Sequence, residues 1–225
     1  MSSANAAFFL LLFGPLKILF FVVVSLAIMF LVKRSYTRIK GAIGERRTRK
    51  ILESLPETHR VINDLFLQTE RGMSQIDHTV LSPHGIFIIE TKNYEGWIFG
   101  DEHAEYWTQV IYDTRNRFYN PVRQNYGHVQ ALKEVLGRFG DFPYYPVVVF
   151  DGGCTLKKMN TTHPVIYQNQ LVDLILERKR EVVLTEREID RLYVTLLAAH
   201  CQGKEVRKQH MAGVRTKRVH TVSPA

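Results

Sequence analysis

The stretch of sequence that decides the fold is QIDHTVLSPHGIFIIETKNY, residues 75–94. Two apolar runs flank the turn sequence Ser82-Pro83-His84-Gly85, which predicts a β-hairpin with strands over 75–81 and 85–93. The second strand begins with Ile86-Phe87-Ile88-Ile89 and then runs directly into Glu90 and Lys92. Because burying an unpaired charge is costly, these two side chains need a partner, a metal or a substrate.

A second carboxylate is expected close to this pair. Strand side chains alternate, so Glu90 and Lys92 share a face and stand roughly 6–7 Å apart. A register centred on the turn predicts that Asp77 lies near Lys92 and Asn93, beside the Glu-x-Lys pair. Two carboxylates could hold Mg²⁺, and the lysine could orient an attacking water or offset developing negative charge. A salt-bridge cluster with no catalytic role is the alternative, and the spacing alone leaves both open.

The composition describes a chain with one core-forming domain and charged flanks. It has 225 residues, a net charge of +8, and two cysteines, Cys154 and Cys201, which cannot form a disulfide framework; no CxxC or Cys/His cluster suggests zinc. Residues 33–50 carry eight Lys and Arg against one Glu, and residues 202–225 carry six against one. The rest of the chain is therefore net acidic. Overall basicity by itself does not indicate a nucleic-acid-binding protein.

The N-terminal segment is expected to be a membrane anchor. Residues 6–32 are apolar except for Lys17, Ser25 and the Gly14-Pro15 pair, and a bilayer core of about 30 Å needs roughly 20 such residues. A cleaved signal peptide is the competing interpretation, but the run is long and no basic residue precedes it. Lysines and arginines follow directly, at positions 33, 34, 38 and 40, so the positive-inside rule predicts a single-pass protein with its C-terminal domain in the cytoplasm. The basic run 33–50 would then contact anionic lipids.

The remaining elements predict a mixed α/β domain. Helices are expected over 37–55, 124–139, 169–178 and 185–202, and further strands over 61–67, 146–150 and 164–168. Short strands and loops are expected between Trp97 and Tyr119, and the basic tail after Gly203 is expected to be disordered. The predicted domains are an anchor over 1–33, a folded domain over 34–202 and a tail over 203–225.

Five ordered blocks across about 100 residues resemble the nuclease-related domain (NERD) family, a branch of the PD-(D/E)xK restriction-endonuclease-like superfamily. The matching stretches lie between residues 41 and 139 and are Gly41-Ala42-Ile43-Gly44-Glu45, Gln75-Ile76-Asp77-His78, Gly85 to Asn93, Gly96 with Trp107, and Asn120-Pro121-Val122-Arg123-Gln124-Asn125. One departure from the superfamily pattern is Ile76, which precedes Asp77 where a proline would stand.

The resemblance implies a restriction-endonuclease-like mixed sheet flanked by helices, and a specific set of site residues. Asp77, Glu90 and the backbone carbonyl of Thr91 would bind Mg²⁺ or Mn²⁺, and Lys92 would be the catalytic lysine. Glu45 would be an additional acid from the first helix, and Gln124 an accessory polar residue. The implied function is a membrane-anchored, Mg²⁺-dependent nuclease acting on DNA, with RNA as the other possible substrate.

Two further functions are compatible with the sequence. One is a catalytically inactive nucleic-acid-binding or scaffold module at the membrane, although the complete acid and lysine set argues against it. The other is a membrane-surface signalling or stress protein whose partner is another protein.

Other conspicuous residues are interpreted as structural. His78 is expected to be a packed or capping residue, and Trp97 and Trp107 to pack in the core or in a lid. Asp151-Gly152-Gly153-Cys154 is expected to form a turn.

Overall fold

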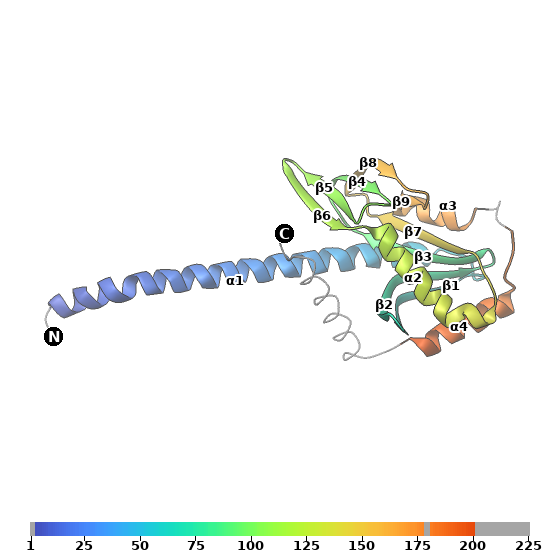
Figure 1. Ribbon diagram of the computed structural model, residues 1–225, viewed down its shortest axis with the longest axis horizontal. Helices are drawn as coiled ribbons and strands as arrows, with labels where there is room; N and C mark the ends of the chain where they lie inside the picture. Colours follow the sequence, from blue (N-terminus) through green and yellow to red (C-terminus); the bar gives the residue numbers. More distant parts are fainter. Residues whose placement is uncertain (1–2, 178–180, 201–225) are drawn as a thin grey trace. The chain divides into compact units, whose positions relative to one another are not determined.

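The computed structural model describes residues 3–177 and 181–200, and the side chains of residues 3–16, 33, 34 and 37 also lie outside that description (Figure 1). The chain divides into two compact units, Met1–Ile43 and Gly44–Ala225. The first helix, α1 (Ser3–Leu52), supplies the described part of the first unit and the opening of the second. The predicted tail over 203–225 and Cys201 fall outside the described residues.

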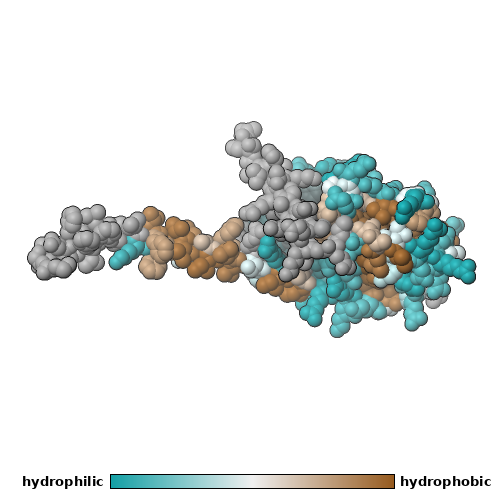
Figure 2. All heavy atoms as spheres, turned by 90° about the horizontal axis from the view of Figure 1, so that it is seen from below, coloured by the Kyte–Doolittle hydropathy of each residue, from teal (hydrophilic) through white to brown (hydrophobic). Residues whose placement is uncertain are grey.

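The side chains of α1 from Ile18 to Val32 are apolar except for Ser25. The residues from Ile18 to Val32 are mostly exposed, with Phe20, Phe21 and Phe30 each more than 60% accessible, and Figure 2 shows them as an apolar surface along the helix. Within the described part of the chain, none of the helices has an apolar stretch of the length that a bilayer core demands. The expected anchor over 1–33 extends into residues whose side chains are not described.

The second unit is built on a five-stranded mixed sheet, as the sequence predicts. Its strand order is β1-β2-β3-β7-β9, with antiparallel pairing across β1, β2 and β3 and parallel pairing across β3, β7 and β9. The strands are β1 (Arg60–Thr69), β2 (Gly72–Ser82), β3 (Gly85–Lys92), β7 (Tyr144–Phe150) and β9 (Val165–Tyr167). Strand β3 lies at the centre, and all of its residues except Lys92 are buried.

Helices cover both faces of this sheet. Helices α2 (Pro121–Leu136) and α4 (Glu186–Ala199) pack on one face, where Ile86 and Ile88 of β3 meet Leu132 and Leu192. The end of α1 and the short helix α3 (Leu171–Ile175) pack on the other face, against Phe87 and Ile89. Alternate residues of β3 therefore belong to two different cores, which explains why the strand reads as a continuous apolar run.

A second sheet, of four strands in the order β6-β5-β4-β8, was not predicted as a unit. Its members are β4 (Gly96–Asp101), β5 (Tyr106–Ile111), β6 (Thr114–Tyr119) and β8 (Cys154–Asn160), and its β5–β6 hairpin projects beyond the other strands (Figure 1). The sequence CTLKKMN of β8 has exposed lysines and no regular apolar alternation, so it was missed. Ile98 and Trp107 from this sheet pack against Val148 and Phe150 of β7 and form a third core.

The predicted helix over 169–178 is not one continuous helix. Residues 169–178 contain the 3₁₀ turn η2 (Gln168–Gln170) and α3 rather than one helix, and Arg178 lies outside the described residues. A second 3₁₀ turn, η1 (Gly137–Phe139), follows α2. A capping box starts α4, since Thr185 Oγ1 accepts from Glu188 N and the Glu188 carboxylate accepts from Thr185 N.

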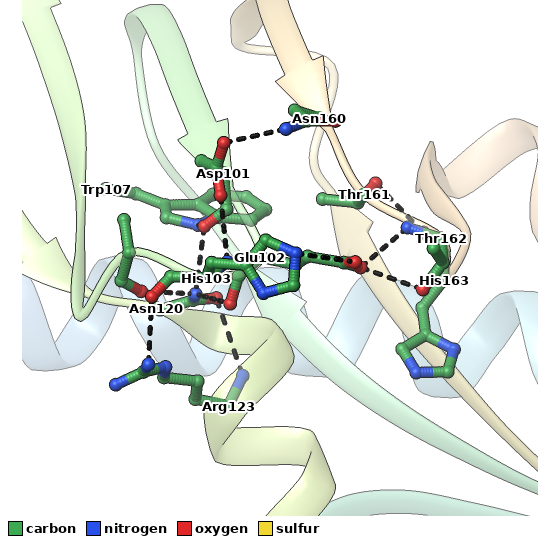
Figure 3. A network of polar contacts seen from close by, with 11 residues as sticks. Asp101, Glu102, His103, Trp107, Asn120, Arg123, Asn160, Thr161, Thr162 and His163 are labelled. Carbon is green, nitrogen blue, oxygen red and sulfur yellow. Dashed lines mark hydrogen bonds and ion pairs between the residues drawn. The ribbon is translucent and has the colours of Figure 1, made fainter.

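Helix α2 starts at Pro121, three residues before the predicted position, because Asn120 caps it. The Asn120 side-chain oxygen accepts from Val122 N at 2.9 Å and from Arg123 N at 3.4 Å. Its amide nitrogen donates to the carbonyl oxygens of Asp101, Glu102 and Ala104 at 2.7–3.1 Å (Figure 3). One fully buried side chain thus joins the β4–β5 loop to the helix start.

The Asn120 contacts predict a strong stability effect. Asn120→Ala should lower the free energy of unfolding by about 2–4 kcal/mol, because it removes a helix cap and leaves buried carbonyls without a donor. The check is urea denaturation of the full chain, with exposed Asn169→Ala as the matched control. Asn120→Asp keeps the cap but places a carboxylate against the three carbonyls, so it should be at least as destabilising as the alanine. A wild-type midpoint for Asn120→Asp would show that the cap alone matters.

Candidate active site

The last residues of β3 form a charged site at the end of the buried strand. Glu90 and Lys92 lie on the same face as Ile86 and Ile88, as the alternation predicts. Lys92 Nζ is 2.5 Å from Glu90 Oε1, and the two side chains are 17% and 2% exposed, respectively. The ion pair therefore lies where the core ends and the surface begins.

Asp77 lies beside this pair, but not at the predicted register. The β2–β3 pairing ends with His78 opposite Ile89, which places Asp77 next to Glu90 rather than next to Lys92 and Asn93. Its Oδ2 atom accepts a 2.9 Å hydrogen bond from Thr91 N. The strands pair symmetrically about the turn, with Ser82 opposite Gly85, so the position predicted for Asp77 was about two residues too far along β3. The Asp77 carboxylate accepts its hydrogen bond from β3 just beyond the last strand pair.

Opposite environments set the charges of the two carboxylates. Burial alone would raise the pKa of Glu90, but the Lys92 ammonium and the hydrogen bond from His128 outweigh burial and lower that pKa to about 2. Burial and the neighbouring Glu90 charge raise the pKa of Asp77 well above its usual value, against the opposing effect of Lys92. Glu45 adds repulsion at Asp77. Asp77, Glu90 and Glu45 thus lie near one lysine, and the charged form of Asp77 is disfavoured.

Helix α2 supplies two polar side chains to this site. Gln124 Oε1 accepts from Lys92 Nζ at 3.1 Å, so the structure brings the predicted accessory residue to the lysine. His128 was not predicted, yet its Nε2 atom donates to Glu90 Oε2 at 3.2 Å. Its Nδ1 atom lies 2.9 Å from Ser74 Oγ on β2. The four-residue spacing of Gln124 and His128, which places both on one helix face, is the signal that could have found it.

The second-unit end of α1 approaches the strand end closely at Gly44. A Cβ on Gly44 would lie 2.9 Å from Asn93 Cβ, so only glycine fits without a shift. Thr48, one turn on, accepts from Thr91 Oγ1 at 3.4 Å and from Gln168 Nε2 at 2.9 Å. This packing brings the half-buried Glu45 close enough to raise the pKa of Asp77, which agrees with the additional acid that the resemblance implies. No pattern in the sequence marks Gln168 or Thr48 as neighbours of the site.

A hollow of about 290 Å³ opens next to the ion pair. Lys92 and Gln124 form one side of it, and the β5–β6 hairpin forms the other. Its lining residues are Lys92, Tyr94, Gln109, Asn116, Arg117, Phe118, Tyr119 and Gln124. A ligand in this hollow would touch the lysine and also reach the guanidinium-bearing strand β6.

Comparison with known proteins identifies the family of this chain. A model of the nuclease-related domain matches residues 40–151, the segment that contains the acids, the lysine and Gln124. An uncharacterized protein of Bacillus anthracis is 34% identical over 211 residues, which cover 90% of this chain and 98% of that protein. The chain belongs to the nuclease-related domain family. The family match ends at the turn after β7, so β8, β9, α3 and α4 of this NERD protein lie beyond it.

One solved structure, of a protein of unknown function, is similar to this NERD protein with a TM-score of 0.28 and 10% identity. The similarity covers 59% of this chain and 53% of that structure, and carries no argument about fold or function.

The donor atoms of the NERD site fit a hard cation that keeps much of its water. Among the described residues, no group of three or more His, Cys, Asp and Glu side chains could form a metal site by itself. Asp77 and Glu90 nevertheless offer adjacent carboxylates, and the raised pKa of Asp77 reflects negative charge that a cation would neutralise. Mg²⁺ is commonly held by one or two carboxylates and several waters. The side chains present are thus chemically suitable, with the Thr91 carbonyl as the predicted third donor.

The residues interpreted as structural lie in structural positions, with one exception. His78 is buried, its Nδ1 atom lies 2.7 Å from Asn63 Oδ1, and burial lowers its pKa to about 4. Trp107 is in the third core and Cys154 is buried after the turn that begins at Asp151. Trp97, by contrast, is 51% exposed, so it does not pack in the core, which is one of the two positions expected for it.

The buried ion pair predicts a charge-specific stability effect at Lys92. Lys92→Met keeps the apolar stem but leaves the Glu90 carboxylate buried with only His128, so the free energy of unfolding at pH 7 should fall by about 3–5 kcal/mol. Adding Glu90→Gln in the same chain should recover most of that loss. The measurement is urea denaturation of both variants. If the double variant were no more stable than Lys92→Met, loss of packing rather than loss of charge would explain the effect.

A pH series tests the same pair. The folded pKa of Glu90, about 2, lies below its unfolded value, so in the wild type the Glu90 contribution is present above pH 4.5 and is lost as the pH falls toward 2. Without Lys92, burial raises the pKa of Glu90, and the stability deficit of Lys92→Met should shrink as the pH falls below neutrality.

Proposed function

We propose that this NERD protein is a metal-dependent nuclease of the PD-(D/E)xK type that hydrolyses phosphodiester bonds in DNA. The observation that carries the proposal is the meeting of Asp77, Glu90 and Lys92 at the open end of one strand, beside a hollow lined by polar and basic side chains. Family membership supports nuclease-like chemistry. The choice of DNA over RNA is part of the proposal.

Each residue has a chemically defined role in this proposal. Asp77, Glu90 and the Thr91 carbonyl would hold Mg²⁺ or Mn²⁺, which supplies charge neutralisation at the phosphate and a more acidic bound water. Lys92, held between Glu90 and Gln124, would place its ammonium where negative charge develops in the transition state. Gln124 would orient the lysine, and Glu45 would add an acidic group close to Asp77.

An inactive binding or scaffold module is the second candidate. It is favoured by the short Glu90–Lys92 contact, because the two charges neutralise each other without any ligand. In that case the site would stabilise the end of β3 and contribute no chemistry. The two candidates differ in what they predict for a charge-conserving change at Lys92.

The decisive variant is Lys92→Arg. The guanidinium keeps the positive charge beside Glu90, and the adjacent hollow has room for the larger group, so the melting temperature should change little. Its longer, planar head displaces the charge from the ammonium position, so a transition-state contact is lost and plasmid cleavage with Mg²⁺ should fall by about 100-fold or more. Wild-type cleavage by Lys92→Arg, or no cleavage by the wild type with either Mg²⁺ or Mn²⁺, would contradict the nuclease proposal.

A metal titration provides the control that does not depend on turnover. Mg²⁺ should raise the melting temperature of the wild type by binding the folded state, whereas Asp77→Asn should lose that rise and match or exceed the wild type without metal. Asp141→Asn, at an exposed acid before β7, should keep the metal response. An unchanged response in Asp77→Asn would remove Asp77 from the proposed ligands.

We also propose that the chain is a single-pass membrane protein with its folded unit in the cytoplasm. The apolar run over residues 6–32 and the cations at positions 33, 34, 38 and 40 support this location and a contact with anionic lipids. Within the proposed lipid contact, residues 33–50, Arg47 also pairs with Asp151 and Arg49 with Asp64.

The anchor proposal predicts the behaviour of the chain in fractionated cells. Full-length protein should stay with membranes through high-salt and carbonate washing, because its apolar run lies in hydrocarbon. Deletion of residues 1–33 should release the rest. Recovery of the full-length chain in the soluble fraction would refute the anchor without affecting the nuclease proposal.

A further inference from the structure

The four-stranded sheet has one covered face and one exposed face. Ile98, Trp107 and Gln109 point to the covered face and are buried. Alternation therefore directs their neighbours Trp97, Phe99 and Thr108 to the opposite side, which we call the outer face. Across the strands the paired positions on this face are Trp97–Val110–Arg115, Phe99–Thr108–Arg117 and Tyr106–Tyr119.

Aromatic rings on the outer face are accompanied by cations. Trp97 is 51% and Tyr119 is 47% exposed. Lys157 Nζ lies 4.8 Å from the Trp97 ring centroid, and the Arg117 guanidinium lies 4.7 Å from that of Tyr106. Exposed aromatic rings next to basic side chains are the combination that stacks bases and binds phosphates in single-stranded nucleic acid.

A bulge strengthens this basic character. The β4–β8 register shifts between Ile98 and Phe99, so that Lys158 pairs with Phe99 and Lys157 is the extra residue. Both lysines are exposed. The outer-face positions of β4, β5 and β6 that are paired with one another, among the described residues, include no acidic side chain. Asp101 lies beyond these pairs, at the end of β4, and its carboxylate accepts from Asn160 Nδ2 and His103 N.

The outer face is continuous with the candidate active site. Arg117 and Tyr119 belong to it and also line the hollow that contains Lys92 and Gln124. Strand β6, which carries both residues, is the edge strand of its sheet. A strand of nucleic acid lying on the outer face would therefore pass over β6 into the hollow.

We propose that the outer face binds single-stranded nucleic acid and guides it to the site on β3, with Trp97 and Tyr119 stacking on bases and Arg117, Lys157 and Lys158 contacting phosphates. This inference rests on the proposed nuclease function for its purpose, but binding to the face does not require cleavage. Single strands fit better than duplex because paired bases are stacked on each other and do not offer their planes to side chains.

The test is a binding titration of the full chain with a fluorescent 15-mer of deoxythymidine in EDTA, where a metal-dependent cleavage step cannot proceed. Trp97→Ala and Arg117→Ala should each weaken binding by about tenfold or more. Arg117→Ala should also reduce the dependence of affinity on salt, by about one unit of log–log slope. Tyr126→Ala and Arg187→Ala, at exposed residues of α2 and α4, are the matched controls and should change the affinity less than twofold.

The two tryptophans provide an internal reporter. Trp97 is exposed and Trp107 is 1% exposed, and the chain has no other tryptophan. The oligonucleotide should quench the emission of the wild type, and Trp97→Ala should lose that quenching while its melting temperature stays near the wild-type value. Quenching that persists in Trp97→Ala would overturn the stacking assignment.

The outcomes separate this inference from the nuclease proposal. Binding that depends on Trp97 and Arg117, in a protein that does not cut with Mg²⁺, would support the face and refute the nuclease. Cleavage by a protein whose binding is unaffected by either change would refute the face alone. Equal or tighter binding to a 15-base-pair duplex would overturn the preference for single strands, and no oligonucleotide binding at all would indicate a protein partner for the face.

Discussion

The constraint on which this structure depends is the burial of charge at the end of β3. The strand passes through the centre of the larger sheet and contributes to two cores, so its last residues cannot simply enter solvent. Glu90 is 2% exposed and needs compensation, which Lys92 and His128 provide from two directions. The position of α2 is therefore an electrostatic requirement as well as a matter of packing, because an unpaired carboxylate in this position would be strongly destabilising.

Two asparagines hold α2 in that position. Asn120 joins the helix start to the β4–β5 loop, and the buried Asn125 donates to the carbonyl oxygens of Ile88 and Val147, between the two parallel strands. The helix is thus attached both to the smaller sheet and to the strand that carries the site. Gln124 lies between these two attachments, which explains how a flexible amide is placed 3.1 Å from Lys92.

The smaller sheet forms one side of the hollow beside the site. Its covered face closes the third core and borders the hollow, while its outer face presents aromatic and basic residues. Strand β6 belongs to both environments, because its alternate residues point to opposite sides. A site on a rigid strand end next to a projecting hairpin would accommodate a polymeric substrate, whose length exceeds any closed pocket.

The sequence by itself determined the local features. The hairpin over 75–92, with Asp77, Glu90 and Lys92 towards one end of it, follows from a pattern within about twenty residues, where turn chemistry and periodicity act directly, and the order of the elements indicates the α/β class. Only the tertiary structure decided which distant residues meet. The role of His128 depends on a contact across 38 residues, and the separate four-stranded sheet with the surroundings of Trp97 depends on the β4–β8 pairing. Strand β8 shows the reason: its partner β4 lies more than fifty residues earlier, and the bulge that makes Lys157 an extra residue interrupts the apolar alternation of its sequence.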